Sequence, residues 1–159
     1  MPATSLPNAG VRFPPPFIFV GGFVAGWAIG RFIFSLPLTR DHGSGLASAG
    51  WWVVAAGVCL LAWGMLTFVA MHTAIIPDRP ASRVVTRGPY RFTRNPMYVG
   101  LSIVYLGLCA VVNSLWPVLV LPVVLTLLVR LVIRREEAYL LDAFGTDYAQ
   151  YQAHVRRWL

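Results

Sequence analysis

The chain of 159 residues has no lysine, six acidic residues and two cysteines, and only 12% of its residues are charged. Soluble domains carry charge on about a quarter of their residues, so an ordinary soluble fold is excluded. Cys59 and Cys109 each lie in an apolar run with no histidine or second cysteine nearby. This excludes a disulfide framework and a zinc site, and we expect no bound metal. The three histidines form no facing pair inside an apolar segment, which argues against haem.

Long apolar stretches are what the chain does have. Hydrophobic residues make up 57% of it, and the mean hydropathy is +0.65. A helix needs about 20 residues to cross a hydrocarbon core of about 30 Å, and four stretches approach that length: 17–38, 47–71, 97–113 and 116–133. The first has no small-residue cleavage site behind it, so it does not resemble a removable signal. We predict an all-α integral membrane bundle of four transmembrane helices, with residues 1–159 forming a single membrane domain.

The basic residues are all arginine, and the formal net charge is +7. Ten of the 13 fall outside the apolar stretches on what would be one side of the membrane: Arg12, Arg79, Arg83, Arg87, Arg91, Arg94, Arg134, Arg135, Arg156 and Arg157. The positive-inside rule makes that side cytoplasmic and places both termini there. Because these arginines alternate with apolar segments, we expect them to contact anionic membrane lipid and no nucleic acid.

Residues 1–72 are expected to supply two packing helices. Their glycines repeat as Gly22, Gly26 and Gly30 in the first stretch and as Gly50, Gly57 and Gly64 in the second. Small residues on one stripe let helix backbones approach closely. Arg31 is the exception in this half, and it is either a functional charge within the membrane or one that extends to the interface.

A very short connection, Asn113-Ser114-Leu115, joins the third and fourth stretches. Asn113 can end one helix and Ser114 can cap the next, so we expect a tight antiparallel hairpin. At about 1.5 Å of rise per residue, residues near 95 and near 136 return to a similar depth. Two polar clusters distant in sequence should therefore meet.

The first cluster is RGPYRFTRNPMYVG, residues 87–100. Asn95 and Pro96 form an N-cap and N1 pair that begins the third helix. Free N–H groups at a helix start, together with the charge of Arg94, suit a carboxylate or phosphate. The alternative is a capped helix whose arginines contact lipid phosphates.

The second cluster contains Glu136 and Glu137, where the fourth helix leaves the membrane. One glutamate can face the hairpin while the other pairs with an arginine such as Arg130 or Arg134; the alternative is a solvated charge cluster. With the rings of Tyr90, Tyr98 and Tyr139, the two clusters suit a ligand with an anionic end, a cationic end and an aromatic base. S-adenosylmethionine has these three parts.

Three motifs occur in order in this half of the chain: Gly88-Pro89-Tyr90, then Arg94-Asn95-Pro96-Met97-Tyr98-Val99-Gly100 and, after an apolar hairpin, Arg135-Glu136-Glu137. Together they resemble the isoprenylcysteine carboxyl methyltransferase and phospholipid methyltransferase superfamily. The signature of these integral membrane enzymes, which use S-adenosylmethionine, is Arg-His-Pro-x-Tyr, a hydrophobic segment and Glu-Glu. The resemblance covers about residues 75–159 and is to bacterial members. It implies that residues 73–159 form a catalytic, cofactor-binding half, in a protein of the bacterial inner membrane.

The resemblance also implies a function: methyl transfer at the membrane interface to a lipid, an isoprenoid or another small apolar acceptor. The implied cofactor pocket consists of Arg87, Gly88, Tyr90, Arg94, Asn95, Pro96, Tyr98 and Gly100, closed by Glu136 and Glu137. Glu136, Glu137 and Asn95 are the candidate catalytic residues, although Asn95 stands where the eukaryotic pattern has histidine and cannot act as a base at neutral pH. His72 either contacts cofactor or substrate or marks the membrane boundary.

Two other function classes suit a small membrane protein. One is a non-catalytic membrane scaffold or transporter subunit that binds anionic lipid, although such a protein has no use for Glu136 and Glu137. The other is membrane redox chemistry with haem, which the absence of facing histidine pairs disfavours. The soluble methyltransferase fold is excluded because no Gly-x-Gly-x-x-Gly follows a strand.

The tail is predicted to form a last helix. Gly145 ends the preceding helix, and Thr146-Asp147 begins the new one. Tyr148, Tyr151, Val155 and Trp158 fall on one stripe, which is typical of an interfacial amphipathic helix. This helix either covers the cofactor pocket or only anchors the tail.

Overall fold

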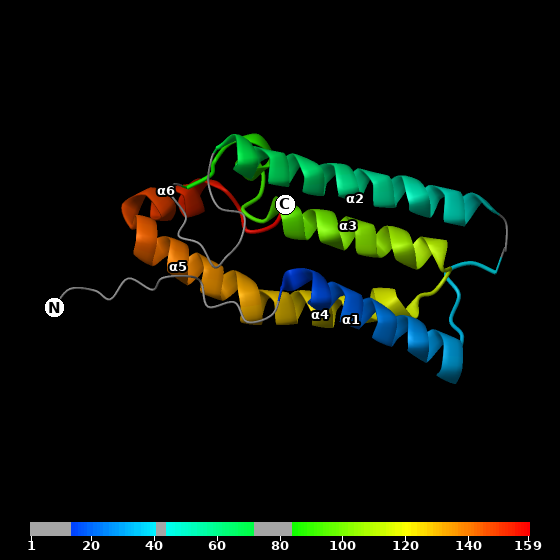
Figure 1. The fold of residues 1–159 in the computed structure, drawn as a ribbon. Helices are drawn as coiled ribbons and strands as arrows, with labels where there is room; N and C mark the ends of the chain where they lie inside the picture. The colour runs from blue at the N-terminus through cyan, green and yellow to red at the C-terminus, as the bar shows by residue number, and fades with distance from the viewer. Residues whose placement is uncertain (1–13, 41–43, 72–83) are drawn as a thin grey trace.

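The computed structural model describes residues 14–40, 44–71 and 84–159. Every regular element in these ranges is helical (Figure 1), which confirms the all-α prediction. The α-helices are α1 (Pro15–Ala28), α2 (Ser44–Ala70), α3 (Pro96–Val111), α4 (Trp116–Leu128), α5 (Arg134–Phe144) and α6 (Thr146–His154). Two π-helical turns, η1 (Ile29–Ile33) and η3 (Val129–Ile133), and a 3-10 turn, η2 (Gly88–Arg91), complete the set.

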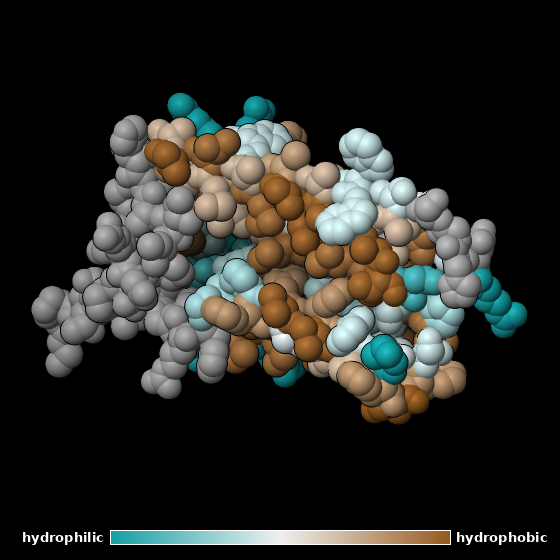
Figure 2. Space-filling view, turned by 45° about the vertical axis from the view of Figure 1, so that its right-hand side comes forward, coloured by the Kyte–Doolittle hydropathy of each residue, from teal (hydrophilic) through white to brown (hydrophobic). Residues whose placement is uncertain are grey.

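Within the described ranges, three helical segments are long and apolar enough to cross a membrane: Pro15–Ile33, Gly45–Ala70 and Trp116–Phe144. Helix α3 is apolar but shorter, with 16 residues. Figure 2 shows apolar side chains gathered over the middle of one face, while hydrophilic ones lie mainly toward the periphery. The described helices therefore have the surface of a membrane protein.

The first helical segment ends at Ile33, not at residue 38 as predicted. Phe34 is extended, with φ of −151°, and the chain then passes over the connection between α3 and α4. There the Phe34 carbonyl accepts a hydrogen bond from Trp116 Nε1 at 2.6 Å, and the Leu36 carbonyl accepts one from the Leu115 amide at 2.8 Å. These bonds require carbonyls that a continued helix would use internally.

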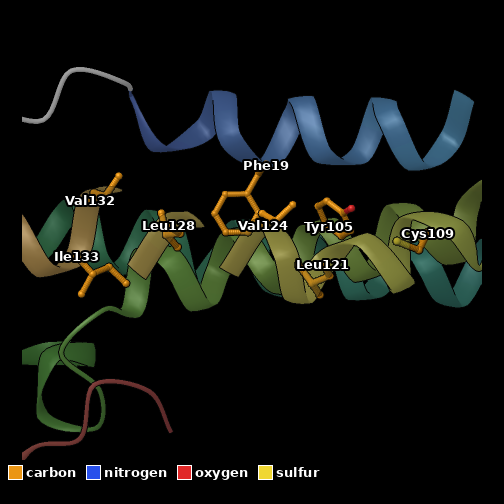
Figure 3. Packing of buried hydrophobic residues seen from close by; sticks show 8 residues of the cluster. All are labelled: Phe19, Tyr105, Cys109, Leu121, Val124, Leu128, Val132 and Ile133. Carbon is orange, nitrogen blue, oxygen red and sulfur yellow. The ribbon is translucent and has the colours of Figure 1, made fainter. Parts of the chain in front are cut away.

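The helices alternate in direction, so that the start of α1, the end of α2, the start of α3 and all of α5 lie toward one end (Figure 1). We call this the motif end. Helix α2 packs along α3, and α1 packs along α4. Figure 3 shows Phe19 pointing from α1 toward a row of buried side chains on α3, α4 and η3. This core contains Phe19, Tyr105, Cys109, Leu121, Val124, Leu128, Val132 and Ile133.

The predicted glycine stripes lie at the helix contacts. A Cβ on Gly57 would lie 2.8 Å from the Gly100 carbonyl oxygen of α3, and one on Gly50 would lie 2.8 Å from the Gly107 oxygen. On α1, a Cβ on Gly26 would lie 2.6 Å from Pro117 Cα. The close approach of α2 to α3 therefore depends on glycine on both helices.

The connection between α3 and α4 is tight, as predicted, but it closes differently. Asn113 has φ of +48° and ends α3, with hydrogen bonds from the Ser114 amide to the Cys109 carbonyl and from the Asn113 amide to the Ala110 carbonyl. This pattern is a Schellman motif. The expectation that Ser114 caps α4 is wrong, because the helix begins at Trp116 with Leu115 at the N-cap and no side-chain cap.

The glycine contact gives a test of the fold. Gly57→Leu should force α2 away from the α3 backbone and lower the free energy of unfolding by about 1–3 kcal/mol, the usual cost of overpacking. Gly21→Leu is the control, because Gly21 has nothing within 4 Å of its Cβ position. Thermal unfolding in detergent measures both variants. Equal midpoints for Gly57→Leu and the native chain would contradict the packing.

Candidate functional site

The first wall of the site is the turn that leads into α3. Gly88 has φ of +59° and opens η2, which places the buried Tyr90 ring against Phe68 of α2 at 5.2 Å between ring centroids. Asn95 stands at the N-cap of α3 as predicted, but its side chain does not cap the helix. The backbone N–H of Asn95 donates a hydrogen bond to the Thr93 hydroxyl at 3.2 Å. The side-chain amide of Asn95 makes no bond to the helix and binds the tail.

The second wall is α5. The π-helical turn η3 comes directly before it, and such a turn inserts one residue into the helical register. The side chains beyond it are therefore rotated by about 100° relative to an uninterrupted α-helix. In this register Glu136 and Glu137 both contact residues of the first wall.

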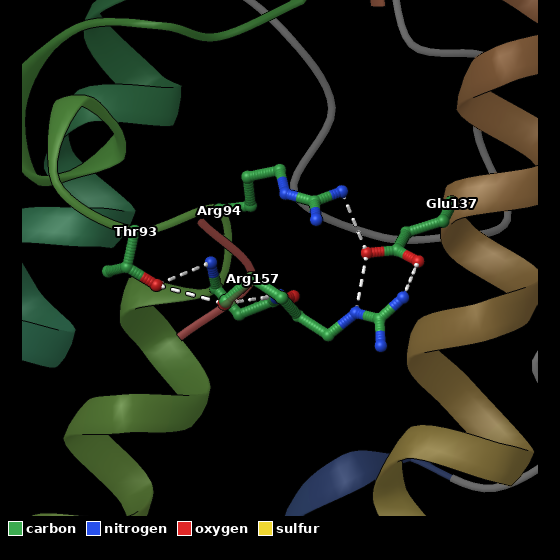
Figure 4. A network of polar contacts seen from close by, with 5 residues as sticks. Thr93, Arg94, Glu137 and Arg157 are labelled. Carbon is green, nitrogen blue, oxygen red and sulfur yellow. Dashed lines mark hydrogen bonds and ion pairs between the residues drawn. The ribbon is translucent and has the colours of Figure 1, made fainter. Parts of the chain in front are cut away.

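Glu137 lies between two guanidinium groups (Figure 4). Its Oε1 accepts hydrogen bonds from an Arg94 terminal nitrogen at 3.0 Å and from Arg157 Nε at 2.9 Å, while its Oε2 accepts one from an Arg157 terminal nitrogen at 2.6 Å. The Arg157 pair is thus bidentate, the strongest form of this interaction. The side chains of Arg94 and Glu137 are each 13% exposed, so these two charges are largely removed from water, whereas the side chain of Arg157 is 36% exposed. The partners of Glu137 are therefore Arg94 and Arg157, not Arg130 or Arg134.

Glu136 contacts the hairpin, as expected for one of the two glutamates. The Tyr98 hydroxyl donates to both of its carboxylate oxygens, at 2.9 and 3.0 Å. Tyr98 lies one turn into α3, so this contact joins α3 to α5 directly. The predicted meeting of residues near 95 with residues near 136 is thereby confirmed.

The tail forms the third wall. Helix α6 begins at Thr146 as predicted, after Gly145 at φ of +51°, but it ends at His154, and Val155 is already extended. The prediction of one continuous amphipathic helix through Trp158 is therefore wrong. The reason is a set of carbonyl contacts that require an extended backbone: the Arg156 carbonyl accepts from the Arg94 amide at 2.9 Å. The Arg157 carbonyl accepts from Asn95 Nδ2 at 3.0 Å and from the Thr93 hydroxyl at 3.1 Å.

Burial and charge shape the electrostatics of this region. The hydrogen bonds to Glu137 raise the pKa of Arg157 above its ordinary value. Burial, and then the charge of Glu137, raises the pKa of Tyr148, whose ring is 3% exposed. Burial also raises the pKa of Tyr90. The tyrosines around the carboxylates are therefore neutral hydrogen-bond donors near neutral pH.

The structure brings together some of the predicted pocket residues and separates others. Arg94, Asn95, Tyr98, Glu136 and Glu137 meet as described, and Tyr90 is buried in the turn that leads into α3. Arg87 is exposed, Pro96 is buried, and Gly88 and Gly100 face α2. His72 lies outside the described residues, as do Arg12, Arg79 and Arg83.

Sequence reasoning missed Arg157 and Thr93 as members of the site. Arg157 lies in the segment that the sequence predicts as an interfacial helix, where its charge is expected to contact anionic lipid. Tyr151 was placed only on the amphipathic stripe, and its hydroxyl donates to the Tyr90 carbonyl at 2.7 Å. The contacts of these residues join segments more than 60 positions apart, which a local pattern does not reveal.

The comparisons with known proteins agree with this architecture. The family model of the phospholipid methyltransferases matches residues 46–147, so the chain belongs to this family. The cobalt-zinc-cadmium resistance protein CzcN of Cupriavidus metallidurans is 38% identical over 76 residues, which are 48% of this chain and 35% of that relative. The match thus spans about a third of the relative's length. No solved structure matches the chain.

The bridging carboxylate can be tested by exchange. Glu137→Gln removes the charge that two guanidinium groups share, and a hydrogen bond to a charged group contributes about 1.5–3 kcal/mol. We expect at least tenfold faster hydrogen exchange in residues 146–159, measured by mass spectrometry. Asp142→Asn is the control, because Asp142 is an exposed acid on the same helix. Unchanged exchange in Glu137→Gln, or an equal increase in Asp142→Asn, would contradict the role of Glu137.

Proposed function

We propose that this member of the phospholipid methyltransferase family transfers a methyl group from S-adenosylmethionine to a lipid, an isoprenoid or another small apolar acceptor at the membrane interface. The observation that supports the proposal best is the meeting of Arg94, Tyr98, Glu136 and Glu137 at the end of an apolar bundle. The family match supplies the reaction class. The cofactor and the acceptor are the parts that we propose.

The residues present fit the proposed cofactor. Arg94 Nε is buried and finds no hydrogen-bond partner among the described residues, and a buried donor without an acceptor is costly. A carboxylate is the acceptor that a guanidinium prefers. Glu136 and Glu137 can hold an ammonium group, and the tyrosine rings can hold an aromatic base. Arg94, Tyr90, Tyr98, Glu136 and Glu137 would hold S-adenosylmethionine, and its sulfonium would supply an electrophilic methyl group.

The chain's own residues then have separate tasks. Arg94 and the glutamates fix orientation, which is the main requirement of an in-line displacement. The tail and the buried tyrosines exclude water. An acceptor carboxylate or thiolate needs no base, whereas an amine or phenol must lose a proton. Glu136 is the candidate acceptor of that proton, because its carboxylate contacts only Tyr98 among the described hydrogen bonds.

Asn95 has a different task from the one expected. Its amide donates to the Arg157 carbonyl, so we assign it to positioning the tail. This leaves Glu136 and Glu137 as the candidates for direct contact with the reactants.

The name of the CzcN relative refers to resistance to cobalt, zinc and cadmium. Among the described residues, no group of three or more histidine, cysteine, aspartate or glutamate side chains could hold a metal ion. The match to that relative is also partial. The relative's name therefore supports no metal-dependent function for this chain.

Binding of S-adenosylhomocysteine, the demethylated product, tests the proposal. Purified protein in detergent should bind it by calorimetry, and Arg94→Gln and Glu136→Gln should each weaken binding at least tenfold by removing a charged contact. Arg91→Gln is the control, because Arg91 is exposed in the same turn and should bind like the native chain. Absence of binding to the native chain, or unchanged affinity in both site variants, would favour the non-catalytic scaffold.

The orientation is a second part of the proposal. The arginine distribution predicts that the motif end faces the cytoplasm of a bacterial inner membrane, with both termini there. Fused after Leu159, a reporter that is active only in the cytoplasm should give a signal, and a matched reporter that is active only in the periplasm should not. A periplasmic signal from a matched reporter would overturn the orientation without affecting the site.

A further inference from the structure

An open cavity of about 440 Å³ lies beside Trp158 of the tail, and none of the residues that line it belongs to the proposed cofactor site. Its lining consists of Leu125, Thr126, Val129, Arg130, Arg134 and Trp158. Arg157 contacts Glu137 while the next residue, Trp158, lines this cavity and packs against the apolar core. The cavity therefore lies near the candidate site, because consecutive residues of the tail contact the two.

Two uncompensated positive charges line this cavity. Arg130 and Arg134 are both exposed, and among the described residues neither pairs with a carboxylate. Both glutamates of the next turn are already engaged, Glu136 by Tyr98 and Glu137 by Arg94 and Arg157. A ligand for this pair of guanidinium groups must therefore bring its own negative charge.

The depth of the cavity identifies the occupant. Arg134 lies 18 residues after Trp116, which corresponds to about 27 Å of helix rise, close to the thickness of a hydrocarbon core. With Trp116 at one interface, Arg134 reaches the opposite headgroup layer, and Arg130 can extend to it from one turn deeper. An anion at this depth is a lipid phosphate.

The surface beside the cavity suits acyl chains. Val123, Leu127 and Leu131 form a stripe on the adjacent face of the same helix, and they are 58%, 43% and 40% exposed. The ring of Trp158 has the amphipathic character of residues that lie at the interface. A phosphate between two guanidinium groups, with apolar chains along this stripe, satisfies both parts of the surface.

We propose that this cavity is a binding site for one anionic phospholipid, whose phosphate is held by Arg130 and Arg134 and whose chains lie along α4. The site is distinct from the proposed cofactor site and does not depend on it. A lipid bound here contacts Trp158, and so it supports the tail segment that places Arg157 on Glu137.

Native mass spectrometry of the full chain in detergent tests the proposal with dioleoyl phosphatidylglycerol as the probe. The native chain should retain one such lipid, and Arg130→Gln with Arg134→Gln should weaken retention at least tenfold. The control is Arg91→Gln with Arg156→Gln, which removes two exposed charges that do not line the cavity. It should retain the lipid within twofold of the native chain. If the double variant does not fold, the two single variants replace it.

Two further arms separate the possible ligands. Dioleoylglycerol has the same chains without a phosphate and should not be retained, and sodium phosphate should not displace the bound lipid. Retention of phosphatidylglycerol by the double variant, or equal loss in the control, overturns the site. Equal retention of dioleoylglycerol shows an apolar groove only, and displacement by inorganic phosphate shows a site for the free ion. Calorimetry with S-adenosylhomocysteine on the same variants is independent, because these arginines do not contact Glu136 or Glu137.

Discussion

The hydrogen bonds from Arg94 and Arg157 to Glu137 determine how the motif end is built. One carboxylate joins residues 43 positions before it and 20 positions after it. At the edge of an apolar bundle an unpaired buried charge is strongly unfavourable, so the largely buried Arg94 and Glu137 each require a partner, and the more exposed Arg157 adds a bidentate contact from the tail. Because of this requirement, the face of α5 that carries the glutamates turns toward α3, and the tail returns across the start of α3.

The bundle consists of two helix pairs, and both approach closely at glycine. Helices α2 and α3 have glycine on both sides of their contact, so it depends on backbone proximity and shape, which still operate when lipid replaces water. Helices α1 and α4 approach at Gly22 and Gly26 of α1, and larger side chains such as Phe19 and Leu128 fill the core beside them. The pairs are joined by the turn at Asn113, by the core contacts of Tyr105 with α1 and α4, and at the motif end by the contacts of Glu136 and Glu137. The candidate site thus lies where two separately stabilised units meet, which allows polar groups there without disturbing either packed interface.

Much of this arrangement could be predicted from the sequence, since the helix rise of an apolar hairpin fixes the depth of its two ends. That arithmetic placed Arg94 and Tyr98 near Glu136 and Glu137, and the glycine spacing indicated the helix contacts. Arg157, the second partner of Glu137, could not be predicted. Its contact depends on an extended tail whose carbonyls are bound by the Thr93 hydroxyl, the Asn95 side chain and the Arg94 backbone amide. The register of α5 depends on a π-helical turn, and a pattern of 3.6 residues per turn contains no sign of it.

The contacts of position 95 suggest what its side chain does. It makes no hydrogen bond to the start of α3, and the backbone N–H of Asn95 donates to the Thr93 hydroxyl. What it does provide is one N–H donor for the Arg157 carbonyl. Asparagine and histidine can each supply such a donor, whereas only histidine can also act as a base near neutral pH. Exchange between the two residues would therefore preserve a donor for the Arg157 carbonyl, and with it the backbone position from which the Arg157 side chain reaches Glu137.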